Sequence, residues 1–227
     1  RIGVHAVQRE KGAPESHRAM SFLSVAAPHS AEKIIEKSRF LTYTAHTAGE
    51  EEARAFLSSV RAQHPLATHV CHAFVADRVG NLMRFSDDGE PQGTAGMPIL
   101  GVLRARRLFE CSVAVVRYFG GIKLGAGGLT RAYSSCAAEC LDGAELALWD
   151  ECAELRVTAD YSEVNALLRF LEGRCTVLSR EFAQKACFVV AVRAQESAAF
   201  CTALADHLCG RAEIRETGKY FAPFPLL

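Results

Sequence analysis

The sequence predicts an α+β fold in two domains, and three observations support that prediction. A chain of 227 residues, 49% of them hydrophobic, is long enough for two small domains that each bury a core. In both halves of the chain, short strand-like runs alternate with helices that are apolar on one side. In the second half, residues 147–227, the order of elements is βαββαβ, which is typical of a ferredoxin-like split sandwich.

The first domain is predicted to cover residues 30–146 and to begin with a strand at Ser38–Thr47. A helix follows, because apolar residues from Ala53 to Val60 recur at helical spacing. Thr47 and Glu50 have the spacing of a capping box at its start. The other predicted elements of this half are strands at His69–Ala76 and Leu82–Phe85, a helix through Ile99, Leu100 and Leu103, a buried strand at Ser112–Tyr118 and a helix from Leu129 to Leu141.

The second domain is predicted to cover residues 147–227, after a boundary near Gly143–Glu151. Its first strand is indicated by Leu155, Val157 and Ala159, which alternate with polar residues. The elements predicted after it are a helix over Val164–Leu171, hairpin strands at Cys175–Phe182 and Ala186–Ala194, a helix over Phe200–Leu208 and a strand at Ala212–Thr217.

Residues 1–29 are predicted to be a disordered extension. Residues 1–20 are polar, with four Arg or Lys and no apolar core, so they do not resemble a signal peptide. The chain has no run of about 18 apolar residues, the length that a membrane-spanning helix needs. Its nine cysteines are odd in number and form no C-x-x-C pair, which favours free thiols. These features predict a cytoplasmic protein.

An acidic stretch follows the predicted strand Leu82–Phe85. Asp87, Asp88 and Glu90 fall within four residues and are followed by several glycines. Such a group can hold a divalent cation through oxygen ligands, or it can close a turn by accepting backbone N–H groups. Because the calcium-loop pattern is not met, we expect no metal and assign these acidic residues to shaping the loop.

A glycine-rich loop with basic flanks joins the buried strand to the helix that follows it. Free N–H groups and the helix dipole favour an anion at a helix N-terminus. From Met97 to Arg131 there are six basic residues and one acidic residue, although the whole chain carries 26 of each. Nucleotide-binding patterns are absent, and the glycines can equally serve tight turns and close packing. The candidates for contact with phosphate or RNA backbone are Arg117, Lys123, Gly125, Gly127, Gly128, Thr130 and Arg131.

Two long motifs carry a resemblance to a known family. RFSDDGEPQGTAGMPIL, followed about twenty residues later by VVRYFGGIKLGAGGLTRAYS, resembles the signature of the IMPACT family. Upstream, KSRFLTYTAHT, EEARAFL and HPLATHVCHAF match that family's N-terminal domain in order and spacing. The resemblance covers about residues 30–142, and the βαββαβ half is similar to the extra domain of bacterial and archaeal members.

The resemblance implies a first domain with the fold of ribosomal protein S5 domain 2 and a second like domain V of elongation factor G. It further implies a regulatory protein of translation, whose partner is RNA or a ribosome-associated protein. We expect no catalytic residue, no cofactor, no membrane contact and no recognition of DNA sequence. Two alternatives stay open: an enzyme acting on a phosphorylated or nucleotide-like small molecule in the same cleft, and a protein-binding module that uses the C-terminal sheet.

Overall fold

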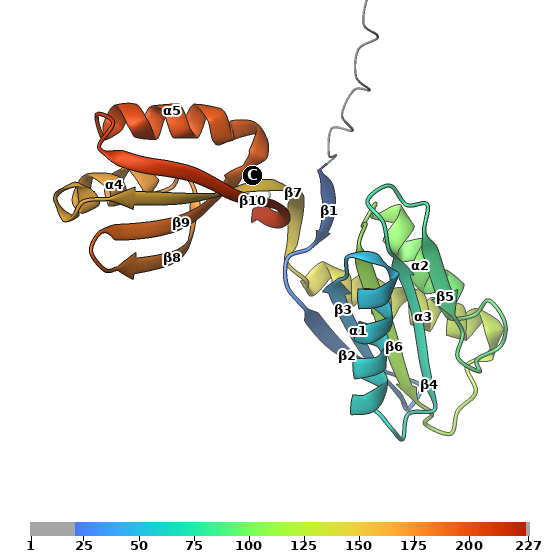
Figure 1. The fold of residues 1–227 in the computed structure, drawn as a ribbon. Coiled ribbons are helices and arrows are strands. Elements are labelled where there is room, and N and C mark those ends of the chain that lie inside the picture. Colours follow the sequence, from blue (N-terminus) through green and yellow to red (C-terminus); the bar gives the residue numbers. More distant parts are fainter. Residues whose placement is uncertain (1–20, 226–227) are drawn as a thin grey trace, which may run out of the picture.

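The computed structural model describes residues 21–225, which form two five-stranded sheets and five α-helices (Figure 1). All strand pairs within these sheets are antiparallel. The predicted class, α+β in two domains, is confirmed. None of the helices within residues 21–225 has the length and apolar composition needed to cross a bilayer.

The first sheet has helices on both faces. Its spatial order is β2 (His29–Ile35), β3 (Ser38–His46), β6 (Cys111–Tyr118), β4 (His69–Val75), β5 (Met83–Ser86). The helices of this half are α1 (Gly49–Gln63), α2 (Gly96–Ala105) and α3 (Gly125–Gly143). Figure 1 shows α1 on one face and α2 and α3 on the other. The central strand β6 is buried along nearly its whole length, as its apolar sequence predicts.

The predicted capping box of α1 is wrong. The N-cap residue is Ala48, and the hydroxyl of Thr47 lies 2.7 Å from that of Ser112 on β6, with no bond from it to the helix among the described residues. The backbone N–H of Ala48, the N-cap residue, instead donates to the carboxylate of Glu52 at 2.7 Å. The start of α1 was therefore predicted within two residues, but by the wrong contact.

The second sheet has the strand order of a split sandwich. β7 (Leu146–Ala159) is flanked by β10 (Ala212–Pro225) and β9 (Ala186–Arg193), and β8 (Thr176–Phe182) lies outside β9. Two helices complete the βαββαβ order, α4 (Val164–Leu171) and α5 (Ser197–His207). Their apolar sides pack with the sheet in one separate core. The predicted boundary at residues 146 and 147 stays a proposal.

The prediction of disorder over residues 1–29 is corrected for the part that the structure describes. Phe22–Val25 form β1, which pairs with the first residues of β7. Phe22 and Val25 are buried, at 3% and 0% exposure. A four-residue strand is too short to show a period, and β2 is an edge strand with several polar residues, so both were missed. Residues 1–20 lie outside the described part.

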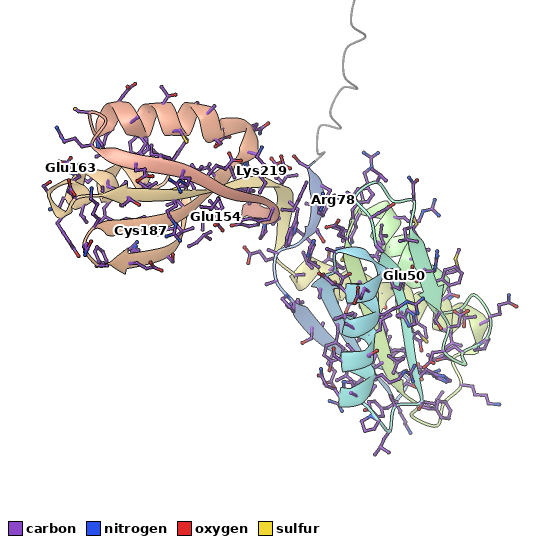
Figure 2. The ribbon with its side chains drawn as sticks, viewed as in Figure 1. Glu50, Arg78, Glu154, Glu163, Cys187 and Lys219 are labelled. Carbon is purple, nitrogen blue, oxygen red and sulfur yellow. The ribbon has the colours of Figure 1, made fainter. Side chains whose placement is uncertain are left out.

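A cluster of aromatic rings and charges lies where the two sheets approach each other. His46, at the end of β3, stacks on Trp149 of β7 with ring centroids 3.5 Å apart. Arg78, labelled in Figure 2, has its guanidinium carbon 3.5 Å from the ring centroid of Phe221. Glu110 contacts Arg78 and His46. Its carboxylate accepts a hydrogen bond from Arg78 Nε at 2.8 Å and lies 3.1 Å from His46 Nε2.

This cluster predicts acid sensitivity that depends on Glu110. Burial would raise the pKa of its carboxyl, but the bonds to His46 and Arg78 outweigh burial and lower the pKa below its ordinary 4.5. The stabilisation by the Glu110 carboxylate is therefore complete above pH 4.5 and is lost as pH falls through the folded-state pKa. In urea unfolding at a series of pH values, Glu110→Gln should lose less stability below that pH than the wild type. Glu181→Gln, exposed on β8, is the control, and an equally steep loss in both variants would contradict the prediction.

All nine cysteines are free thiols, as predicted. Four of them belong to the first domain's packing and are fully or nearly buried: Cys71, Cys111, Cys136 and Cys140. Burial raises the pKa of Cys71 and Cys140 to about 12. These thiols therefore act as small apolar side chains.

Candidate functional site

The acidic loop is held together by hydrogen bonds from its own backbone to Asp87. The Asp87 carboxylate accepts the backbone N–H groups of Gly93, Ala95 and Gly96, at 2.8, 3.0 and 2.8 Å, and so closes the N-terminus of α2. Burial would raise the pKa of Asp87, but these three bonds hold it below its usual range. Asp87 thus shapes the loop, with both oxygens occupied by protein donors.

Asp88 fixes the same loop to α1 and β4. Its Oδ2 accepts the N–H of Val70 at 2.6 Å and lies 2.8 Å from Arg61 Nη2. Burial opposes ionisation, but Arg61 and the Val70 N–H hold the pKa of Asp88 below its usual range. Within residues 21–225 no group of His, Cys, Asp or Glu side chains has the arrangement of a metal site.

Glu90 connects the acidic loop to the second motif. Its Oε1 accepts from Arg117 Nη1 and from the Tyr133 hydroxyl, each at 2.7 Å. Arg117 lies on β6 and Tyr133 on α3, so one carboxylate joins the loop, the central strand and the long helix. Glu90 is 8% and Arg117 5% exposed, which makes this a buried ion pair.

The assignment of Arg117 to phosphate contact is therefore corrected. Its second terminal nitrogen, Nη2, donates to the Ser38 hydroxyl at 3.2 Å, and its Nε has no hydrogen-bond partner among the described residues. A guanidinium that is buried and paired cannot reach a ligand in solution. Sequence alone gave its charge but not its burial, because the partner lies 27 residues away in the chain.

A groove lies between the start of α3 and the turn that joins β2 to β3. Its volume is about 580 Å³. Two predicted basic residues line it, Lys123 before the helix and Arg131 in its second turn, against one acidic residue, Glu36. Neither Lys123 nor Arg131 forms an ion pair with any residue in the described range. The side chains that line the groove therefore carry a net positive charge.

The first turn of α3 adds to that positive character. No side chain of residues 21–225 caps it, and it contains no acidic residue. Its leading N–H groups, at Gly125 to Gly127, have no partner inside the helix and carry the positive end of the dipole. Arg131 Nη1 lies 3.5 Å from where a Cβ on Gly127 would stand, so the guanidinium covers this turn. An anion in the groove would meet both charge and backbone donors.

The structure brings some of the predicted site residues together at the groove and places the others elsewhere. Lys123, Gly128 and Arg131 line the groove, and Gly125 and Gly127 lie beside it in the first turn of α3. Thr130 is exposed but lies two residues from Gly128, about 200° around the helix, and so faces away. Arg117 is buried, and the three acidic residues do not line the groove. Lining residues that the sequence interpretation missed are Ile35, Glu36, Ile122, Leu124, Ala132 and Ser135.

The arrangement suits binding of an anion better than nucleophilic catalysis. Tyr133, which donates to Glu90, and Cys71 are both buried. Burial raises the pKa of both, so that both are protonated at neutral pH.

Comparison with known proteins agrees with the two motifs. Residues 36–141 match the model of the Impact N-terminal domain. An IMPACT family member of Haemophilus influenzae is 38% identical over 81% of this chain and 91% of its own length. IMPACT family member YigZ of Escherichia coli is 38% identical over 86% of this chain and 97% of its own.

A solved structure shares the fold. A crystal structure described as that of a hypothetical protein is 37% identical, with a TM-score of 0.57, and covers 87% of this chain and 98% of its own. Because relatives of this identity match along most of both chains, the similarity extends beyond the N-terminal domain into the split sandwich. The chain belongs to the IMPACT family.

Proposed function

We propose that this protein is a cytoplasmic regulator of translation that binds RNA through the groove at the start of α3. The observation that carries the proposal is a pair of cations, Lys123 and Arg131, that line the groove at the start of α3 and form no ion pair within residues 21–225. Phosphate groups are the anions that such a site fits, because it offers both point charges and N–H donors. The translation role rests on the resemblance of the chain to the IMPACT family.

The charge of the groove predicts the kind of binding. Lys123 and Arg131 would contact phosphates, which carry no sequence information, so affinity should vary little among RNA sequences. Each neutralised phosphate of a single strand releases counterions and contributes about 0.7 to the slope of log affinity against log salt. The slope of log affinity against log salt is therefore a quantitative test of the proposal.

Replacing Lys123 and Arg131 together with Ala should reduce that slope by about 1.4. The measurement is fluorescence anisotropy of a labelled single-stranded RNA titrated with protein at several salt concentrations. The matched control is Arg156→Ala with Arg180→Ala, which removes the same charge from exposed positions on the second sheet. An unchanged slope in the folded groove variant, or the same reduction in the control, would contradict the proposal.

A phosphorylated small molecule is the second candidate ligand. The groove's volume, about 580 Å³, lies within the range of small-molecule sites. Competition separates the two candidates. Displacement of RNA by a nucleoside monophosphate at far lower concentration than by inorganic phosphate would favour the small-molecule alternative.

A further inference from the structure

Phe119 is an exposed aromatic side chain at the end of a buried strand. It directly follows β6, whose residues are buried up to Arg117, yet 47% of Phe119 is exposed. The guanidinium carbon of Arg117 lies 5.4 Å from its ring centroid. The ring is therefore supported by a cation while nearly half of its surface faces solvent.

The backbone around Phe119 is held on both sides. Its own N–H donates to the Thr68 hydroxyl at 3.1 Å, and the N–H of Gly120 donates to the Ser38 hydroxyl at 3.3 Å. Gly120 also packs directly on the carbonyl of Lys37. A side chain displayed from a fixed backbone loses little entropy when it binds, so Phe119 is preorganised for contact.

In the sequence, Phe119 lies a few residues before Ile122 and Lys123, which line the groove. Three residues lie between it and Lys123, so their Cα atoms lie within about 15 Å of each other whatever path the loop takes. A strand of a few nucleotides covers that distance. A phosphate held by Lys123 and Arg131 would thus leave a neighbouring nucleotide within reach of the ring.

We propose that Phe119 stacks on a base of single-stranded RNA whose phosphates occupy the groove. The inference rests on the proposed function and names the class of RNA. An exposed aromatic ring beside a positively charged track is the combination by which proteins bind single strands. Duplex RNA keeps its bases stacked inside, and its deep, narrow major groove does not admit side chains. The protein should therefore prefer single strands to duplexes of equal charge.

The test measures binding of a labelled oligouridine and of an RNA hairpin with the same number of phosphates. Phe119→Ala and Phe119→Leu should each weaken oligouridine binding about tenfold, and Phe119→Tyr should stay within about threefold of wild type. None of them should change the salt slope, because no phosphate contact is removed. Phe85→Ala, which removes a 45% exposed ring from β5, is the matched control and should bind as wild type.

The outcomes separate this inference from the proposed function. If wild type binds neither RNA, the proposed function fails. If it binds both equally and Phe119→Ala changes nothing, RNA binding stands and base stacking is wrong. If Phe119→Leu binds as wild type while Phe119→Ala does not, the site recognises apolar surface, as a protein partner would offer, and stacking is also wrong. Thermal unfolding of each variant confirms that the fold is intact.

Discussion

Replacing Arg117 with Met should lower the free energy of unfolding of the first domain by about 3–5 kcal/mol. The substitution leaves the Glu90 carboxylate buried without its guanidinium partner; only the Tyr133 hydroxyl would still donate to Oε1, and His69 Nε2 lies 3.8 Å from Oε2. It also removes the bond from Arg117 to Ser38, which holds the end of β6 against the start of β3. Urea unfolding followed by far-UV circular dichroism measures the loss.

Two further variants test that explanation. Arg131→Met removes an exposed arginine from the same region and should change stability by less than about 0.5 kcal/mol. Adding Glu90→Gln to Arg117→Met removes the uncompensated charge while keeping an acceptor for Tyr133, so the double variant should be more stable than Arg117→Met alone. If the double variant is as unstable as the sum of its parts, the carboxylate and the guanidinium do not act as a pair.

The behaviour of Arg117 also explains a limit of the sequence interpretation. Charge and loop composition singled out Arg117, Lys123 and Arg131 as equivalent candidates, because all three are basic residues around one glycine loop. These three residues differ in whether a carboxylate from a distant part of the sequence forms an ion pair with them in the fold. Glu90 reaches Arg117 through the folding of the acidic loop onto β6, a contact that no local pattern reports.

The elements that were predicted well are those whose apolar spacing is long and regular. β6 and α3 show a continuous apolar run and a stripe over three turns, and both occur where expected. The second half was predicted in full order, βαββαβ, because each of its strands and helices has an apolar pattern of its own. β10 extends to Pro225, beyond the predicted Thr217, since pairing with β7 continues past the end of the alternating pattern.

The groove could not be predicted from the motifs because one of its walls comes from elsewhere in the chain. Its second wall is the turn after β2, a mostly polar edge strand without a clear period. Two consecutive residues of that turn, Glu36 and Lys37, have positive φ angles of 45° and 63°, and neither is a glycine. Sequence rules place such angles at Gly or Asn, so the tight β2–β3 turn gave no signal.

Gly120→Ala should destabilise the first domain by about 3 kcal/mol and should also weaken RNA binding. A Cβ at this position would lie 1.9 Å from the carbonyl oxygen of Lys37, 2.0 Å from its carbon and 2.5 Å from the nitrogen of Ser38. All three are backbone atoms, so no rotamer change relieves the clash and the β2–β3 turn must move. Because that turn is one wall of the groove, the same displacement should change binding. Urea unfolding and RNA anisotropy measure the two effects.

Gly127→Ala is the matched control for Gly120→Ala. Gly127 lies in the first turn of α3, and the nearest atom to its added Cβ is the mobile end of Arg131, at an ordinary 3.5 Å. Ala favours helix over Gly, so this variant should be more stable by about 0.5–1 kcal/mol. The pair thus separates the two roles of the loop: close packing requires a glycine at residue 120, whereas residue 127 requires only a free N–H, which alanine retains. A Gly120→Ala protein as stable as wild type would show that the β2–β3 turn yields easily and does not fix the groove.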